Sequence, residues 1–294
     1  MTRSSLTKVD PRLYQIATLA ALLTYGWARL DFDITPTRVG LLLGTVLITQ
    51  YGCSRLWGLD RFDPRSPLIS GLSLCLLFRT NDPVLAVLAA AIAVASKFVL
   101  RTGGKHVFNP TNLAVVVLLL VSDRVWVSPG QWGSAAWFAF LMACAGGLVV
   151  TRAARADVTL AFLTVWVLLV GGRSFWLGEP MAIPIHRLQS GALLLFAFFM
   201  ISDPKTTPDS RAGRLLFATV VALGAWYVQF RLFRTNGLLW SLAASSFLVP
   251  LIDRWLPGPA YAWPGSQIAS TKDIAHAPLS RRRPVRSGAS ALAR

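Results

Sequence analysis

Long apolar stretches separated by short polar ones dominate this chain. A helix that crosses a membrane needs about 20 mainly apolar residues. The hydrophobic positions predict ten helical segments in the 294 residues: 13–30, 39–58, 66–79, 82–100, 109–123, 132–154, 157–178, 184–202, 212–234 and 236–253. The third and fifth are short, with polar residues directly after the third and directly before the fifth. The pattern predicts an all-α integral membrane protein with about ten transmembrane helices.

The segments also indicate an internal repeat. Ser70-Gly71 and Ser190-Gly191 lie 120 residues apart, and the same offset moves the first two segments onto the sixth and seventh. An insertion of about a dozen residues aligns the fourth and fifth with the ninth and tenth. Because five helices per copy is an odd number, the second copy must enter the membrane upside down, which places short or broken helices at the repeat interface. We expect a transmembrane domain over 13–255, with one repeat at 13–125 and the other at 132–255.

Composition and charge agree with a membrane protein. Hydrophobic residues make up 54% and charged residues 14%, and the mean hydropathy is +0.54, whereas soluble domains carry about 25% charge. The net charge of +16 lies in short loops and a tail, which argues against a nucleic-acid surface. If the N-terminus is cytoplasmic, 21 of the 29 Lys and Arg residues lie inside. This distribution predicts a multi-pass membrane protein with residues 1–12 and a basic, disordered tail at 256–294 both cytoplasmic.

The two Ser-Gly pairs open similar stretches. "LISGLSLCLLFRTNDP" spans Leu68–Pro83 and "LQSGALLLFAFFMISDPKTTPDS" spans Leu188–Ser210. Ser can cap a helix start, Gly permits close approach, and Pro after Asp ends the preceding helix. One interpretation is a half-helix that begins inside the protein, where its free N–H groups attract electron-rich ligands. The alternative is that Gly serves helix packing and that Asp-Pro is an ordinary helix exit.

A second polar stretch, "RTGGKHVFNPTNLAVV", precedes the fifth segment. Lys105 and His106 offer cationic or donor groups, and Asn109 and Asn112 flank Pro110, which suits a first helical turn. Asn side chains at a helix start can hydrogen-bond a heterocycle or a carbonyl. An interfacial turn with an extended lysine would give the same pattern. Lys97, inside the fourth segment, is a further candidate, or a lysine that reaches back to the interface.

Three blocks resemble the RnfD/NqrB family, which comprises the membrane-embedded D component of the Rnf electron-transport complex and the related B component of the sodium-pumping NADH:quinone reductase. "KHVFNPTNLAVVVLLL" is similar to a Gly-x-Asn-Pro-Phe-Asn-Pro-Ala block, and "SSFLVPLIDRW" to an Ala-x-Val-Pro-Leu-Ile-Asp ending. The most specific block, His186–Pro208, resembles His-Leu-Leu-Ser-Gly-Gly followed by Ala-Phe-Phe-Met-Ala-Thr-Asp-Pro-Val-Thr-Ser-Pro. The resemblance covers about residues 13–255.

The resemblance implies a flavin-carrying subunit of an ion-coupled redox pump in the bacterial plasma (inner) membrane, with other Rnf-like subunits as partners in the lipid bilayer. As an enzyme it would be at most a non-catalytic or flavin-carrying subunit of a membrane oxidoreductase complex. The family attaches FMN through the Thr of a Ser-Gly-Ala-Thr motif between helices five and six. That loop, "SDRVWVSPGQWGS", lacks the motif, and Leu193 follows Ser190-Gly191-Ala192 without an acceptor hydroxyl. We therefore expect no covalent FMN but a noncovalent riboflavin or FMN. The candidate binding residues are Ser70, Gly71, Lys105, His106, Asn109, Pro110, Asn112, Ser190, Gly191, Asp203, Pro204 and Thr206.

Other function classes have weaker support. No Cys-x-x-Cys occurs, and the three histidines lie far apart, so we expect no haem, Fe–S cluster or metal site. The alternative to electron transport is a stand-alone transporter- or channel-like relative without redox activity, since members of the family occur alone in enediyne natural-product gene clusters.

Overall fold

Helices form at all ten predicted segments in a computed structural model that describes residues 10–30, 32–59, 61–128 and 136–262. The first five segments become α1 (Pro11–Arg29), α2 (Pro36–Leu56), α3 (Arg65–Leu77), α4 (Pro83–Val99) and α5 (Pro110–Val121). The next helices are α6 (Ala136–Arg152), α7 (Ala156–Leu177), α8 (Ala182–Leu188), α9 (Gly191–Leu195), the π-helix η1 (Phe196–Met200), α10 (Arg211–Phe230), α11 (Gly237–Ser246) and α12 (Val249–Trp255). The predicted tail beyond residue 262, and residues 1–9, lie outside the described residues.

Only some of these helices are long enough to cross a membrane. Among the described residues, α2, α7 and α10 meet the criteria of length and apolarity, and the bent pair of α8 with α9–η1 counts as a fourth span. The remaining apolar helices, α3, α4, α5 and Ala143–Arg152 of α6, have 10–17 residues. The chain is therefore a mostly helical membrane protein with three or four candidate spans and several shorter apolar helices.

Two predicted segments are broken rather than continuous. The eighth bends by 46° between Leu188 and Gly191. The tenth divides between Ser246 and Val249, where Pro250 falls in the first turn of α12. Because proline lacks an N–H group and clashes with the preceding turn, it starts a new helix more readily than it continues one.

The predicted end of the third segment is wrong, because the prediction continued the helix to residue 79. The helix α3 ends at Leu77, and β1 (Phe78–Thr80) pairs antiparallel with β4 (Val125–Val127). A second short pair joins β2 (Arg101–Thr102) to β3 (Lys105–His106). In the turn between β2 and β3, Gly103 and Gly104 both have positive φ, at 58° and 81°, a conformation that glycine adopts without steric cost.

Side-chain caps and prolines set several helix starts. Thr35, Asp82, Asn109 and Ser210 accept hydrogen bonds from the first-turn N–H groups of α2, α4, α5 and α10. The first three of these helices also begin with proline, whose missing N–H group is not needed there. Asp82-Pro83 therefore begins a helix, which differs from the expected role of Asp-Pro as a helix exit.

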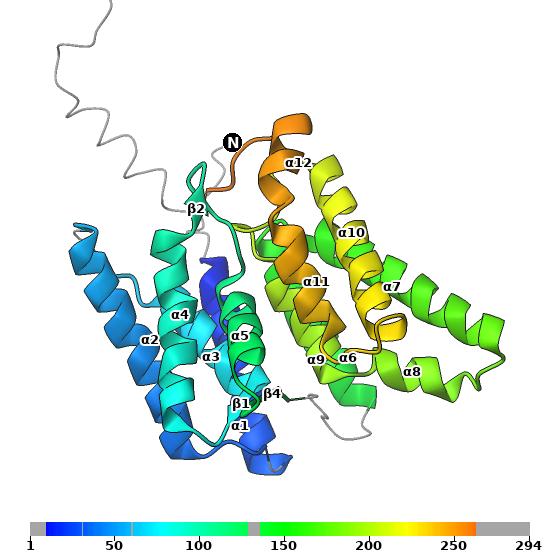
Figure 1. Ribbon diagram of the computed structural model, residues 1–294, viewed down its shortest axis with the longest axis horizontal. Coiled ribbons are helices and arrows are strands. Elements are labelled where there is room, and N and C mark those ends of the chain that lie inside the picture. The colour runs from blue at the N-terminus through cyan, green and yellow to red at the C-terminus, as the bar shows by residue number, and fades with distance from the viewer. Residues whose placement is uncertain (1–9, 31, 60, 129–135, 263–294) are drawn as a thin grey trace, which may run out of the picture. The chain divides into compact units, whose positions relative to one another are not determined.

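The helices pack in two similar groups. In the first, α4 contacts both α2 and α5, and α3 contacts α1 and α2. In the second, α10 contacts α7 and α11, and η1 contacts α6 and α7. Figure 1 shows α2, α4 and α5 on one side, and α7, α10 and α11 on the other. The two groups meet where α1 contacts α6 and where α5 contacts α11.

Small residues let the central helices approach closely. The buried face of α4 includes Ala86, Ala89, Ala90 and Ala93. The corresponding face of α10 includes Ala218, Val221, Ala222 and Ala225. Such spacing puts each set on one helix face, and small side chains at a membrane helix interface allow van der Waals contact between backbones.

Candidate functional site

A cavity of about 490 Å³ lies between the two helix groups, beside the break in the eighth segment. Leu77, Val127 and Ser128 of the first group form one wall. The broken helix contributes Ser190, Ala192, Phe196 and Met200. The end of α10, the start of α11 and the connection between them contribute Gln229, Phe233, Arg234, Thr235, Asn236, Gly237, Leu238 and Leu239. Apolar walls with a few amides and hydroxyl groups are typical of small-molecule and cofactor sites.

Local backbone geometry forms the two polar edges of this cavity. Ser190 stands at the N-cap position of α9, and its carbonyl oxygen accepts from the Leu194 N–H group. At the opposite edge, Asn236 has a φ of 60° and precedes α11. The following residue, Gly237, has no room for a Cβ, which would lie 2.7 Å from the Ala225 carbonyl oxygen. The chain thus enters α11 tightly against α10.

Two asparagines at the start of α5 tie the helix groups together next to the cavity. Asn109 caps α5 by accepting from the Asn112 N–H group at 3.0 Å, and its Nδ2 donates to the Met200 carbonyl oxygen at 3.3 Å. The fully buried Asn112 donates from Nδ2 to the Leu239 carbonyl oxygen at 3.1 Å. Its Oδ1 is buried without a partner. The predicted first turn of a helix at Asn109-Pro110 is confirmed.

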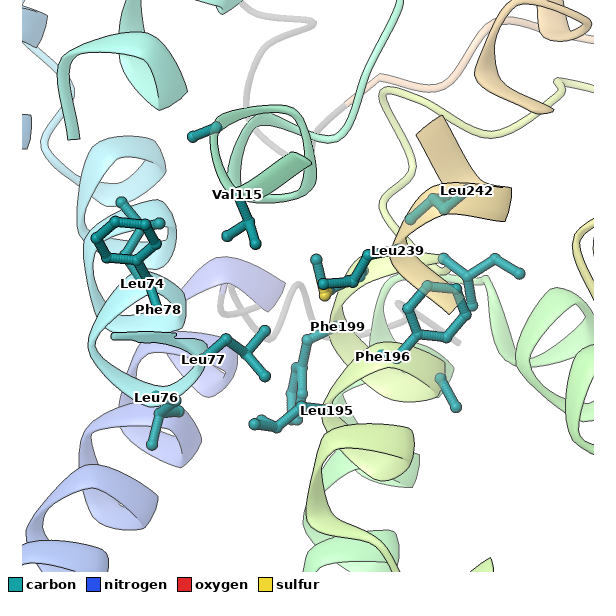
Figure 2. Close-up of a cluster of buried hydrophobic side chains, with 14 of the residues drawn as sticks. Leu74, Leu76, Leu77, Phe78, Val115, Leu195, Phe196, Phe199, Leu239 and Leu242 are labelled. Atoms are coloured by element: carbon teal, nitrogen blue, oxygen red, sulfur yellow. The ribbon is translucent and has the colours of Figure 1, made fainter. Parts of the chain in front are cut away.

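Apolar side chains surround this contact between the groups. Figure 2 shows Leu77 and Val115 of the first group pointing toward Phe199 and Leu239 of the second. All four side chains are buried. Because polar groups in such surroundings need partners, the asparagine hydrogen bonds fix how α5 lies against η1 and α11.

Ser70 and Gly71 have a different role from their counterparts in the second half. Ser70 lies inside α3 and donates from Oγ to the Ser66 carbonyl oxygen at 3.3 Å, so it does not cap the helix start as expected. A Cβ at Gly71 would lie 2.9 Å from side-chain atoms of both Leu43 and Val46. The glycine therefore permits close packing of α3 on α2. The two Ser-Gly pairs are alike in sequence but not in position on their helices.

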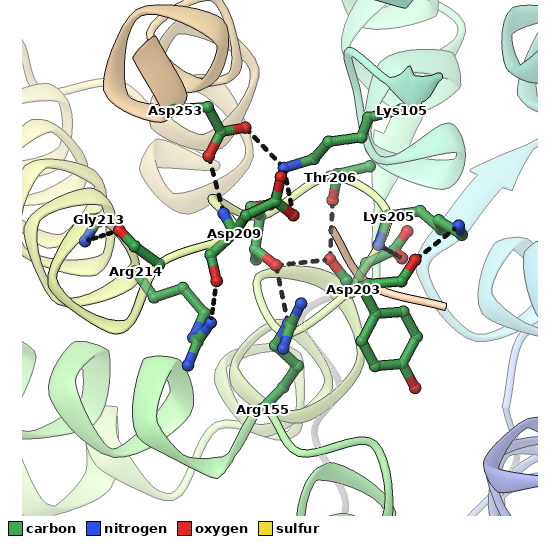
Figure 3. A network of polar contacts seen from close by, with 12 residues as sticks. Lys105, Arg155, Asp203, Lys205, Thr206, Asp209, Gly213, Arg214 and Asp253 are labelled. Atoms are coloured by element: carbon green, nitrogen blue, oxygen red, sulfur yellow. Dashed lines mark hydrogen bonds and ion pairs between the residues drawn. The ribbon is translucent and has the colours of Figure 1, made fainter. Parts of the chain in front are cut away.

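A charged network occupies the end of the helix groups where α4 joins α5 (Figure 3). Lys105 donates from Nζ to Asp253 Oδ2 and to the Thr207 carbonyl oxygen, both at 2.7 Å. Asp209 Oδ1 lies 3.1 Å from the same Nζ, as an ion-pair contact and not an aligned hydrogen bond. The Asp209 N–H group in turn donates to Asp253 Oδ1 at 2.7 Å.

Asp203, Pro204 and Thr206 belong to a compact turn in this network. Asp203 Oδ1 accepts from the Lys205 N–H group at 3.0 Å, and the Asp203 carbonyl oxygen accepts from the Thr206 and Thr207 hydroxyl groups at 3.3 and 3.1 Å. Burial raises the pKa of Asp203, while the Lys205 N–H group and nearby cations oppose that rise. Figure 3 shows the Asp203 turn between Lys205 and Arg155.

His106 lies in the same neighbourhood. Its Nδ1 is buried without a hydrogen-bond partner. Burial, together with the positive charges of Lys97, Arg101 and Lys205, lowers the pKa of His106 to about 4. Lys97, buried in α4, donates from Nζ to the Ser66 carbonyl oxygen and to Ser66 Oγ, at 3.1 and 3.0 Å. The lysine is thus held by α3.

Sequence reasoning missed several members of the charged network. Arg155 donates from Nε to Thr207 Oγ1 at 3.2 Å and lies 4.7 Å over the Tyr261 ring. Arg214 forms a bidentate pair with Asp157 at 2.6–3.1 Å. A carboxylate at the edge of an apolar run is a usable signal, because such a charge needs a partner. Asp253, at the end of the apolar run in "LVPLIDRW", is such a carboxylate, and its position indicates that a cationic partner lies nearby.

The predicted site residues therefore fall into three places. Lys105, His106, Asp203, Pro204 and Thr206 lie in or next to the charged network. Asn109, Pro110, Asn112, Ser190 and Gly191 lie around the cavity, where Ser190 forms part of the wall. Ser70 and Gly71 pack α3, although the Ser70 carbonyl oxygen accepts from Thr111 Oγ1 at 3.5 Å. About 15 Å of helix, α9 and η1, separates Ser190 from the Asp203 turn.

Part of this chain is similar to known proteins. Residues 120–261 match the model of the NQR2, RnfD, RnfE family. The chain is 32% identical over 125 residues to the D component of the ion-translocating oxidoreductase complex of Escherichia coli O139:H28 (strain E24377A / ETEC). It has the same identity over the same length to the D component of that complex from Shigella boydii serotype 18 (strain CDC 3083-94 / BS512). Each alignment covers 42% of this chain and 34% of the relative, so the chain matches about one third of the length of these relatives.

Proposed function

The chain belongs, through residues 120–261, to the NQR2, RnfD, RnfE family, and on this premise we propose that it is a membrane subunit of an ion-coupled electron-transport system that holds a flavin noncovalently. The observation that carries the proposal is the cavity of about 490 Å³ between the helix groups. Ser190, Ala192, Phe196 and Met200, all from the block that resembles the RnfD/NqrB family most specifically, form one wall.

The residues around the cavity fit an isoalloxazine ring. The volume of the cavity falls within the range of about 300–1,000 Å³ that small-molecule sites occupy. Phe196 and Phe233 offer aromatic surface for the apolar part of the ring. The Gln229 and Asn236 amides offer donors and acceptors for the polar edge. These residues would bind and orient the flavin, which when bound supplies one- and two-electron transfer.

The sequence supports attachment without a covalent bond. The loop at 122–134 has no Ser-Gly-Ala-Thr motif, and Leu193 stands after Ser190-Gly191-Ala192. Arg234, in the cavity wall, would pair with a phosphate group if the flavin is FMN. Riboflavin would leave that guanidinium exposed to solvent.

The architecture that we propose is an inverted repeat of five helices plus five. Two observations support it. The contacts of α4 with α2 and α5 recur as the contacts of α10 with α7 and α11, and four buried positions of α4 match four buried positions of α10 at a single offset. Ala86, Ala89, Ala90 and Ala93 correspond to residues 132 positions later, which equals the repeat of 120 plus an insertion of twelve. The inserted residues fall in the turn around Asp203. The cavity would then lie at the repeat interface, where transporters with inverted repeats bind substrates.

The proposal also covers the membrane in which the chain lies, its orientation there and its partner subunits. We place it in the bacterial plasma membrane with both termini cytoplasmic, because the Lys and Arg distribution favours that orientation. The relatives named above are subunits of an oxidoreductase complex, so further Rnf-like subunits would supply and receive the electrons.

The test is flavin content after purification in detergent. We expect a yellow protein that releases riboflavin or FMN on denaturation without proteolysis. Ala192→Phe places a ring in the cavity wall and should abolish the flavin content. Ala244→Phe, the same change at an exposed position of α11, should retain it. Wild-type protein without any releasable flavin would refute the proposal.

A second candidate is a transporter- or channel-like relative without redox activity. It is favoured by the 46° break beside a cavity, since broken helices line substrate sites in secondary transporters. Uptake of a small solute into proteoliposomes, lost in Asn109→Ala or Asp203→Asn, would support it. Flavin-containing protein with no uptake of any solute tested would count against it.

A further inference from the structure

A second, much smaller cavity lies at the paired strands β1 and β4, at the other end of α4 from the charged network. Its volume is about 60 Å³, and Arg38 and Arg79 line it together with Thr80 and Trp126. A cavity of this size holds only a few water-sized groups. It is therefore too small for a flavin and is independent of the proposed cofactor site.

Arg79 is buried, with 5% of its surface exposed. Its Nη1 donates to the Cys75 and Phe78 carbonyl oxygens at 2.8 and 3.0 Å, and its guanidinium group lies 5.8 Å from the centre of the Phe32 ring. These partners are neutral. A buried cation without a carboxylate in contact is costly, because neutral dipoles replace only part of its hydration.

Arg38 brings a second positive charge to the same cavity. It lies in the first turn of α2 and donates from Nη1 to the Thr80 carbonyl oxygen. Within the described residues, no carboxylate oxygen lies within 4.0 Å of a nitrogen of Arg38 or Arg79. Among the described residues of the cavity wall, only Asp33 is acidic; it is exposed, and its charge acts on Arg79 without an ion-pair contact. The N-terminal end of the α2 dipole adds further positive potential.

We propose that Arg38 and Arg79 bind a phosphate group in this cavity. Guanidinium groups match the oxygens of a phosphate, which would supply an anion in direct contact with both arginines. The phosphate belongs either to a phospholipid headgroup or to a free anion. Trp126, which is 40% exposed and lies opposite Arg79 in the strand pair, places the cavity at the depth where tryptophans meet the headgroup layer.

The experiment uses full-length protein in detergent, with two variants and a matched control. Arg38→Gln and Arg79→Gln each remove one charge from the cavity. Arg124→Gln removes the same charge from the same end of the protein, but Arg124 is 79% exposed and pairs with Asp82 outside the cavity. Arg38→Gln keeps the test valid if Arg79→Gln fails to fold, since Arg38 is only half-buried.

Two readouts distinguish the sources of the phosphate. For a headgroup, native mass spectrometry should show one phospholipid retained by wild type and Arg124→Gln, with about tenfold less retained by each cavity variant. For a free anion, inorganic phosphate but not chloride should raise the melting temperature of wild type and Arg124→Gln, and Arg38→Gln should need about tenfold more phosphate for the same shift. Either result supports the site. The site is overturned if wild type shows neither effect, or if Arg38→Gln and Arg79→Gln behave as wild type does.

Discussion

Lys105 and Asp253 are 148 residues apart in the chain, yet the Lys105 Nζ lies 2.7 Å from Asp253 Oδ2. The pair joins β3, between α4 and α5, to α12 at the end of the second helix group. Asp209 and the Thr207 carbonyl oxygen share the same ammonium group. One side chain therefore connects the first helix group to two separate segments of the second.

Lys105→Met should destabilise the protein by about 2 kcal/mol, because it leaves two partly buried carboxylates without their cation. Thermal unfolding in detergent measures the loss. Combining it with Asp253→Leu should recover part of that loss, because the second change removes one of the unpaired charges. Arg124→Gln, in the exposed pair with Asp82, should cost less than about 0.5 kcal/mol. Losses that simply add in the double variant would contradict the coupling.

Gly71 should tolerate substitution poorly for reasons of packing. Gly71→Ala puts a methyl group 2.9 Å from Leu43 and Val46 side-chain atoms and should cost about 1 kcal/mol, and Gly71→Leu about 3 kcal/mol. Gly44, in the neighbouring helix α2, has no atom within 4 Å of an added Cβ. Gly44→Ala should therefore be neutral or stabilise by up to about 1 kcal/mol. Equal melting temperatures of Gly71→Ala and Gly44→Ala would show that α3 and α2 are not closely packed there.

Much of the helical pattern could be predicted from the sequence because prolines mark several helix starts. Pro36, Pro83 and Pro110 begin three of the helices, within three residues of the predicted starts. The break in the tenth segment was missed although Pro250 marks it. The strand β1 was missed because three residues are too few to show an alternating pattern.

The site was predictable only in part, for a related physical reason. Asn109-Pro110 forms a local helix start, so nearby residues alone determine it. The partner of Lys105, by contrast, lies 148 residues away, and only the packing of the two helix groups brings it near. The two Ser-Gly pairs show the same limit: Ser190 precedes a short helix, whereas Ser70 continues one that begins at Arg65.

Asn109 should contribute through two separable interactions. Asn109→Ala removes both the cap on the Asn112 N–H group and the hydrogen bond to the Met200 carbonyl oxygen, and should cost about 2 kcal/mol. Asn109→Ser keeps a capping hydroxyl group but cannot reach Met200, so it should cost about half as much. Thermal unfolding of the two variants in the same detergent measures the difference. If serine is as damaging as alanine, the cap contributes nothing and the tie to η1 carries the whole effect.

His106 should make the protein less stable as the pH falls. Its pKa is lowered to about 4 in the folded protein, against about 6.5 for an unperturbed histidine. The unfolded chain therefore binds the proton more readily, so stability is fully present above about pH 6.5 and declines until the folded side chain also titrates near pH 4. The loss from this residue is about 3 kcal/mol at the acid end.

The comparison that isolates this effect is His106→Gln against wild type across that pH range. The carboxylates of the charged network titrate in both proteins, so only the difference between their melting temperatures reports on His106. We expect the difference to shift in favour of His106→Gln as the pH falls from about 6.5 to about 4. His186→Gln, at an exposed position in α8, should follow wild type throughout. Parallel curves for wild type and His106→Gln would mean that water or a ligand satisfies Nδ1 and that the imidazolium is stable in the folded protein.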